Sequence, residues 1–120
     1  MSNPNKAKGA QWERDARDVF IAFGHTACAR VYGEGCPTDV GDLTLGYELR
    51  DFCLQAKNWK DFSPSVWLDA AKRQAVNKGA RYPVAVVKRR GKNALEGYAV
   101  MTLGDFAHLL AELRTLREGE

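Results

Sequence analysis

The feature that most constrains the fold of this chain is segment 35–58, which has the pattern of two β-strands joined by a tight turn. We expect the first strand at residues 38–45 and the second at 49–57, with Gly46 and Tyr47 at the turn. The middle of the second strand is apolar, whereas its end carries polar side chains. An apolar strand that ends in polar residues on one face indicates a functional site at that end.

The polar end of the second strand lies opposite a carboxylate of the first strand. Side chains alternate between the two faces of a strand, so Gln55 and Lys57 share one face. Folding of the hairpin at residues 46–50 brings Asp42 opposite this end. An acidic oxygen, an amide oxygen and an ammonium group then converge, which predicts a site for a hard cation and a phosphate.

The same residues carry a resemblance to a known family. Asp39 or Asp42 followed by Gln55-Ala56-Lys57 resembles the signature of the PD-(D/E)XK nuclease superfamily, with Gln55 in place of the usual acid. The Gln-x-Lys form is similar to that of type IV restriction endonucleases. The resemblance covers about residues 9–110, and the order and spacing of its short motifs carry more weight than any single residue.

A glutamate in the first predicted helix extends this resemblance. Glu13 lies near the start of that helix and resembles the helical glutamate that precedes the hairpin in archaeal Holliday-junction resolvases and their phage relatives. A carboxylate near a helix N-terminus is also favoured by the helix dipole, so a purely structural role for Glu13 stays open.

The resemblance implies a hydrolase of phosphodiester bonds with magnesium or manganese as its cofactor. Magnesium is held in proteins by one or two carboxylates together with water and substrate phosphate. Asp42 is the first expected ligand, and the Gln55 amide oxygen and the Ala56 carbonyl are the next. We expect Lys57 to orient the attacking water and to stabilise negative charge that develops on the phosphate.

Gln55 removes one negative charge from the expected ligand set, which leaves two interpretations open. Either a nearby acid compensates, with Glu13 and Asp39 as the two candidates, or the chain binds nucleic acid without cleaving it. Asp39 is three residues from Asp42 and points away from it on a regular strand, unless a kink at Gly41 redirects it.

Length and composition favour one domain that spans residues 1–120. An apolar content of 45% and a charged content of 28% are typical of globular proteins. The sequence has no apolar run of membrane-spanning length and no signal peptide, so we expect no membrane partner. Three cysteines without a CxxC pair favour reduced thiols and a cytoplasmic location, although a zinc site from His25, Cys28 and Cys36 stays open.

Basic residues are segregated, although the net charge is only +3. Segment 70–95 contains eight basic residues and no acid, so the rest of the chain carries a net charge of −5. This pattern predicts an electropositive face for DNA, with a solvated surface as the alternative, and residues 1–8 add a flexible basic arm. The basic residues expected to contact phosphates are Lys6, Lys8, Lys72, Arg73, Lys78, Arg81, Lys88, Arg89, Arg90 and Lys92.

The remaining elements follow from periodicity and from helix start and stop signals. We expect helices at 10–23, 63–78 and 103–116 and further strands at 26–32, 82–89 and 97–102. The order αβββαββα indicates an α/β fold with a single mixed sheet of about five strands flanked by helices, and the resemblance implies the restriction-endonuclease-like version of it. Two apolar stripes are expected in the core, Trp12, Ala16, Val19, Phe20 and Phe23 in the first helix and Phe106, Leu109, Leu110, Leu113 and Leu116 in the last.

These observations predict a metal-dependent, structure-selective DNA endonuclease. The resemblance points to a Holliday-junction resolvase of phage type acting on branched DNA, and because resolution needs two symmetric cuts, we expect a homodimer. Two alternatives stay open. They are a nicking or end-processing nuclease of the same superfamily and a non-catalytic nucleic-acid-binding module on the same scaffold.

Overall fold

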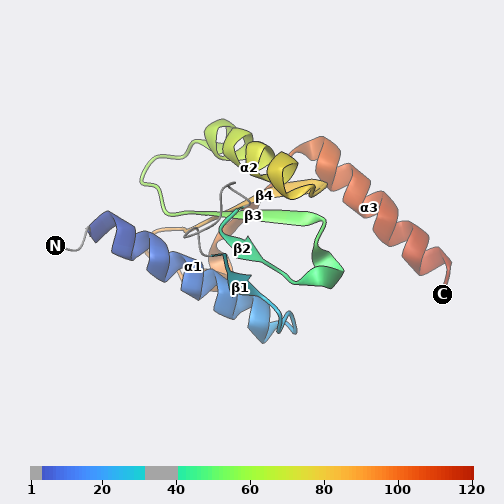
Figure 1. Cartoon of the computed structure of the whole chain (residues 1–120), viewed down its shortest axis with the longest axis horizontal. Helices are drawn as coiled ribbons and strands as arrows, with labels where there is room; N and C mark the ends of the chain where they lie inside the picture. Colours follow the sequence, from blue (N-terminus) through green and yellow to red (C-terminus); the bar gives the residue numbers. More distant parts are fainter. Residues whose placement is uncertain (1–3, 32–40) are drawn as a thin grey trace.

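The computed structural model of the chain describes residues 4–31 and 41–120, with the backbone alone at residues 4–6. Within these residues, three α-helices and five strands form an α/β fold with one mixed sheet (Figure 1), so the predicted fold class and the order αβββαββα are confirmed. The elements are α1 (Pro4–Ala22), β1 (Ala29–Arg30), β2 (Leu43–Thr44), β3 (Phe52–Lys57), α2 (Pro64–Lys78), β4 (Tyr82–Val87), β5 (Tyr98–Val100) and α3 (Leu103–Glu118). Two short 3₁₀ turns, η1 (Tyr47–Leu49) and η2 (Ala94–Glu96), complete the described chain.

The strands lie side by side in the order in which they occur in the sequence. The pairs β1–β2, β2–β3 and β4–β5 are antiparallel, whereas β3 and β4 are parallel and paired over six residues, from Phe52 opposite Tyr82 to Lys57 opposite Val87. Because parallel neighbours need a crossover, α2 connects them over one face of the sheet. The same ends of β3 and β4 therefore meet at one edge of the molecule.

One face of the sheet is covered by α1 (Figure 1). Trp12 and Ala16 are buried against the even-numbered positions of the central strands, which are Leu54, Val84 and Val86, together with Leu43 of β2. The Trp12 indole Nε1 donates a hydrogen bond of 3.0 Å to the Val86 carbonyl, which fixes α1 near the C-terminal end of β4. This anchor determines where the rest of α1, including Glu13, lies on the sheet.

The opposite face is covered by α2. Trp67 packs against Ala85 and Val87, the odd-numbered positions of β4. The helix ends, as predicted, at Gly79, whose φ of 75° is left-handed and is adopted readily only by glycine. Every residue of β4 is buried, as expected for a central strand with helices on both faces.

Several predicted boundaries need correction. The helix α1 begins at Pro4 rather than near residue 10, so residues 4–8 of the expected flexible arm are helical; a proline is well tolerated in a first helical turn. Phe23 is 70% exposed rather than buried, because the helix ends at Ala22 and Gly24 turns the chain away with a φ of 97°. The strands β1 and β2 have two residues each, much shorter than predicted, while residues 32–40 of the predicted hairpin lie outside the described chain.

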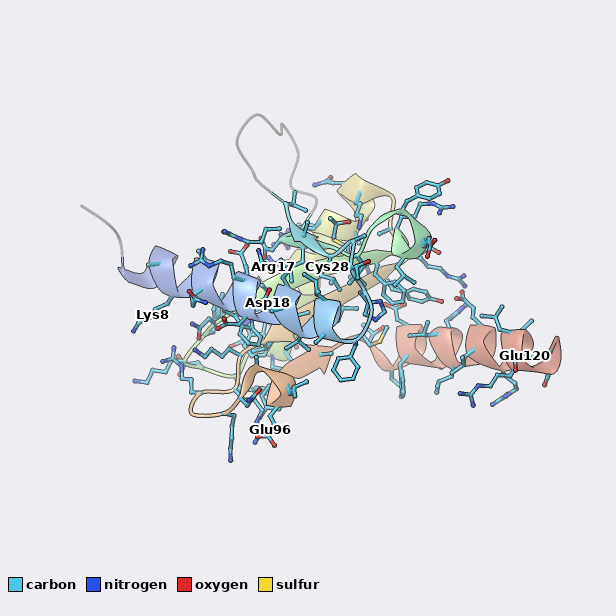
Figure 2. All side chains as sticks on the ribbon, turned by 90° about the horizontal axis from the view of Figure 1, so that it is seen from below. Lys8, Arg17, Asp18, Cys28, Glu96 and Glu120 are labelled. Carbon is cyan, nitrogen blue, oxygen red and sulfur yellow. The ribbon has the colours of Figure 1, made fainter. Side chains whose placement is uncertain are left out.

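The helix α3 begins as predicted, because the Thr102 side chain accepts a hydrogen bond from the Asp105 N–H at 3.1 Å. The prediction that its leucine stripe is core is wrong. Phe106, Leu110 and Leu113 are each about half exposed and Leu116 is 70% exposed, because α3 extends beyond the sheet toward Glu120 (Figure 2). Its contact with the sheet is polar, through Tyr82, whose hydroxyl donates to Glu112 at 2.7 Å. In the described chain, no helix is both long enough and apolar enough to cross a membrane.

Candidate active site

Asp42 is held against β3 by an unusual piece of backbone. Gly41, just before it, has a φ of 99°, and a Cβ built there would lie 3.0 Å from the Leu54 carbonyl oxygen and 3.1 Å from the Cys53 Sγ. Only glycine allows this close approach. The Asp42 N–H donates to the Leu54 carbonyl at 2.9 Å, and its Oδ2 accepts from the Ala56 N–H at 2.9 Å. The hairpin therefore brings Asp42 to the Gln55–Lys57 end of β3, as predicted.

Glu13 reaches the same place from α1. Its carboxylate lies 3.5 Å from the Arg30 guanidinium of β1, and both side chains are largely buried. Burial raises the pKa of Glu13 above its ordinary value of 4.5, the nearby Asp42 carboxylate raises this pKa further, and Arg30 acts in the opposite direction. Two carboxylates from distant parts of the sequence thus influence each other electrostatically, at the end of the sheet where β2 begins.

Gln55 lies on the other side of β3. It pairs with Ala85 in the parallel register, and Ala85 packs under Trp67, so the Gln55 side chain is on the face covered by α2. Gln55 is only 6% exposed, and its Oε1 has no hydrogen-bond partner among the described residues. A buried polar atom without a partner costs about 1–3 kcal/mol.

Lys57 ends β3 and faces a hollow of about 490 Å³. Its Nζ lies 5.1 Å from the ring centroid of Trp59, within the distance for a cation–π interaction. Among the described residues, the hollow is lined by four cations and by no acidic side chain, and this lining comprises Lys8, Gly9, Ala56, Lys57, Asn58, Trp59, Lys60 and Arg90. Lys57 is therefore placed where a phosphate is electrostatically favoured.

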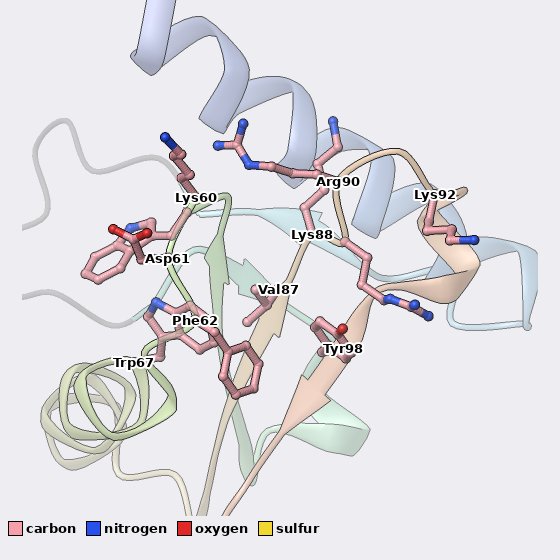
Figure 3. Close-up of a pocket in the computed structure, with 11 residues that line it drawn as sticks. Lys60, Asp61, Phe62, Trp67, Val87, Lys88, Arg90, Lys92 and Tyr98 are labelled. Carbon is pink, nitrogen blue, oxygen red and sulfur yellow. The ribbon is translucent and has the colours of Figure 1, made fainter.

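A second hollow of about 310 Å³ adjoins the first and shares Trp59, Lys60 and Arg90 with it (Figure 3). Its wall combines four aromatic rings, those of Trp59, Phe62, Trp67 and Tyr98, with five basic side chains, those of Lys60, Lys88, Arg89, Arg90 and Lys92. Sequence reasoning missed the aromatic part of this surface. The available signal was the pair of aromatic residues, Trp59 and Phe62, that flank two charged residues shortly after Lys57.

The predicted basic face divides into two groups. Lys88, Arg89, Arg90 and Lys92 lie beside Lys57, at the C-terminal ends of β3 and β4, with Lys8 nearby. Lys78 and Arg81 lie at the opposite end of these strands, where Lys78 donates to the Phe52 carbonyl at 2.6 Å and Arg81 contacts Glu112 and His108. Lys72 shares a hollow with Asp69 and Asp105, and Arg73 is exposed on α2. The side chain of Lys6 lies outside the described residues.

The metal-ligand predictions stay predictions. The described side chains include no group of three or more His, Cys, Asp or Glu placed to hold an ion. Asp39, one of the two predicted compensating acids, and Cys36, of the alternative zinc site, lie outside the described residues, while Cys28 and Cys53 are buried free thiols. Two close carboxylates and an unpartnered amide oxygen nonetheless fit magnesium or manganese, whose sites need few protein ligands.

Comparison of the chain with protein-family models, curated proteins and solved structures gave no match. The functional argument therefore depends on the geometry of the site.

Proposed function

We propose that this protein is a metal-dependent endonuclease that cleaves DNA phosphodiester bonds at the C-terminal end of β3. The observation that carries the proposal is the position of Asp42. Its carboxylate is fixed on the Ala56 N–H, beside Glu13 and next to the strand end where Lys57 opens onto a cationic hollow. Acidic oxygens for a cation and a lysine for a phosphate thus occupy adjacent positions.

The residues of the chain divide the chemistry between them. A magnesium or manganese ion bound there supplies a more acidic water and stabilises charge on the transferring phosphoryl group. Asp42 and Glu13 would hold the ion, and its positive charge would offset the repulsion between their carboxylates. This repulsion contributes to the raised pKa of Glu13. Lys57 positions the attacked phosphate and stabilises negative charge that develops on it. Lys8 and Arg90 retain the flanking phosphates.

Gln55 acts from the face of β3 that α2 covers, which it shares with Lys57. Its unpartnered, buried Oε1 is a neutral oxygen ligand, or it orients a water of the ion's coordination shell. Either role supplies the hydrogen-bond or metal partner that this amide lacks within the described chain. The Ala56 carbonyl is the second neutral oxygen expected at this end of the strand.

The exposed face of α3 supports a homodimer. Phe106, Leu110 and Leu113 form an apolar stripe at helical spacing on a helix that extends beyond the sheet. An acid, Asp105, lies near the start of α3, and Arg114 and Arg117 lie near its end. Antiparallel pairing of two copies about a twofold axis buries the stripe and places each Asp105 near the arginines of the partner. Such a dimer presents two sites, as paired cuts in branched DNA require.

A second candidate function is nucleic-acid binding without cleavage on the same surface. It is favoured by Gln55, which is neutral where the resembled signature has an acid, and by the scarcity of acidic ligands among the described side chains. The cationic and aromatic hollows serve either function.

Incubation of the purified protein with a synthetic four-way junction, a nicked duplex and supercoiled plasmid separates these functions. The proposal predicts cleavage with magnesium or manganese, none with EDTA, and faster cleavage of the junction than of linear duplex. Binding to all substrates with no cleavage in either metal would support the binding module. Equal cleavage of branched and linear DNA would support a nicking or end-processing nuclease.

A further inference from the structure

The aromatic hollow beside Lys57 has a construction that phosphate binding alone does not require. Phe62 lies edge-to-face with Trp67 at 5.3 Å and with Tyr98 at 5.8 Å between ring centroids, and Trp59 meets Trp67 edge-on at 6.0 Å. Trp67 is buried, but the outer rings of Trp59, Phe62 and Tyr98 are between 41% and 66% exposed. Three large aromatic side chains are therefore held in a fixed arrangement with part of their surface open to solvent.

Cations surround these rings. The Arg89 guanidinium lies 5.2 Å from the Tyr98 ring centroid, and the rim also includes Lys60, Lys88, Arg90 and Lys92. Among the residues that the structure describes, Asp61 is the one carboxylate in this lining. The buried Trp67 Nε1, in the same wall, has no hydrogen-bond partner among the described residues. The hollow thus offers aromatic surface, an unused donor and positive charge, within a volume of about 310 Å³ that suits a small flat ligand.

The hollow is continuous with the proposed catalytic end of β3. Trp59, Lys60 and Arg90 line both hollows, and the Lys57 Nζ lies 5.1 Å from the Trp59 ring centroid. A polymer whose phosphate lies at Lys57 therefore has its neighbouring unit at the aromatic rings. In a nucleic acid that unit is a base, and a base reaches the rings only when it is unstacked from its neighbours.

We propose that this aromatic hollow captures one unpaired base of the bound DNA, next to the phosphate held at Lys57. The inference rests on the proposed function for the identity of the polymer, but it concerns binding and not cleavage. Bases that are unpaired at branch points, bulges and mismatches cost the least to unstack, so capture of such a base selects branched over linear duplex. The mixture of rings and cations is the combination that single-stranded nucleic-acid sites use.

Binding in EDTA tests the capture without any cleavage. The probes are three labelled duplexes, one with a single bulged 2-aminopurine, one with an abasic residue at the same bulge, and one fully paired. The abasic probe keeps the phosphates and the bend of the bulge but lacks the base. We expect the base-containing bulge to bind most tightly, and 2-aminopurine emission to fall on binding as the base stacks on a ring.

Removal of one outer ring identifies the hollow as the cause. Phe62→Ala is expected to weaken binding of the base-containing bulge by about 5- to 150-fold, since stacking of one base contributes about 1–3 kcal/mol, and to leave the abasic and paired probes nearly unchanged. Phe62→Leu keeps an apolar side chain and is expected to show the same selective loss, whereas Phe62→Tyr retains the ring and the affinity. The matched control is Tyr47→Ala, an exposed tyrosine 4.1 Å from the Arg50 guanidinium, located at the other end of β3.

Two results overturn base capture. One is equal binding of the abasic and base-containing bulges, which indicates a site for phosphates or for an acidic peptide. The other is a loss in Phe62→Ala that is equal on all three probes. If Phe62→Ala loses affinity only for the base-containing bulge and the wild type does not cleave DNA in magnesium, base capture stands and the proposed catalytic function is contradicted.

Discussion

The Asp42 carboxylate accepts a hydrogen bond from the Ala56 N–H at 2.9 Å, just before β2 begins and opposite the C-terminal half of β3. The bond holds the Asp42 carboxylate at this end of the sheet, where it acts electrostatically on Glu13. Asp42 is only partly exposed to solvent. It depends on Gly41, whose left-handed backbone brings the chain to within contact of Leu54. A local backbone feature thus determines the position of the proposed metal ligand.

The raised pKa of Glu13 makes a prediction about stability. Because the folded state disfavours the Glu13 carboxylate, the free energy of unfolding falls as pH rises from below 4.5 through the raised pKa. Glu13→Gln removes this loss, so at pH 7 the variant should be more stable than the wild type, and the difference should close below pH 4.5. Urea unfolding at several pH values without metal measures it. A less stable variant at pH 7 would show that the ion pair with Arg30 outweighs burial and Asp42.

Metal binding should reverse the order of stability. A ligand present at 100 times its dissociation constant stabilises the folded state by about 2.7 kcal/mol. Magnesium or manganese should therefore raise the melting temperature of the wild type but that of Glu13→Gln much less. Equal shifts in the two proteins would place the ion away from Glu13.

Gln55→Glu restores the negative charge that the resembled signature has at this position. The substitution places a carboxylate where the Gln55 Oε1 lacks a partner, so magnesium affinity should rise and cleavage should persist. Without metal, the buried charge should destabilise the variant. Isothermal titration of both proteins with magnesium provides the comparison, with Gln11→Glu on the exposed face of α1 as the control. An unchanged affinity in Gln55→Glu would mean that Gln55 does not face the ion.

The division of the basic residues predicts unequal effects on DNA binding. Neutralisation of the four basic residues at 88–92 should weaken binding of every DNA sequence. It should also reduce the magnitude of the slope of log affinity against log salt concentration by about three to four, because each phosphate contact contributes about 0.9 to that slope. Neutralisation of Lys72, Lys78 and Arg81 at the opposite strand end should change the slope little. Fluorescence anisotropy across a salt series measures both. A larger change in the second set would place the DNA on the other end of the sheet.

The apolar stripe of α3 predicts the assembly. Leu110→Glu should convert a dimer into a monomer, because it puts two carboxylates at the centre of the antiparallel pair, while the stability of the separate subunit changes by less than about 0.5 kcal/mol. Leu95→Glu, at an exposed leucine on η2, is the control. Light scattering at micromolar concentration gives the mass. A wild-type monomer, with or without a four-way junction, would contradict the dimer.

The sequence predicted the parts of the fold that depend on local signals. The glycine stop at Gly79, the Thr102 cap and the buried strand β4 were all predicted, because capping and continuous apolar character are local properties. The α3 stripe was not predicted correctly, because periodicity reveals an apolar face but not the surface that covers it. The lengths of β1 and β2 were missed for a similar reason, since pairing partners and not propensity determine where an edge strand ends.

For the candidate site, the position of Asp42 followed from the sequence, whereas the packing around it did not. The hairpin pattern placed Asp42 at the end of β3, because antiparallel register follows from the turn. The aromatic hollow could not be predicted from strand register. Phe62, Trp67 and Tyr98 come from a loop, a helix and a strand that only the tertiary fold brings together. The face of Gln55 followed from alternation, but its burial without a partner depended on the packing of α2.

The most direct test of the account compares cleavage by Lys57→Ala and Asp42→Asn with cleavage by Lys60→Ala and Asp51→Asn. The first pair is in the proposed catalytic site. Lys60 lines both the hollow of Lys57 and the adjoining aromatic hollow, and Asp51 is exposed at the opposite end of β3. With magnesium and a four-way junction, the account predicts no detectable cleavage by Lys57→Ala or Asp42→Asn. Asp51→Asn should cleave at nearly the wild-type rate, and Lys60→Ala more slowly but measurably. All four variants should have the circular dichroism spectrum of the folded protein. Wild-type rates in Lys57→Ala or Asp42→Asn would contradict it.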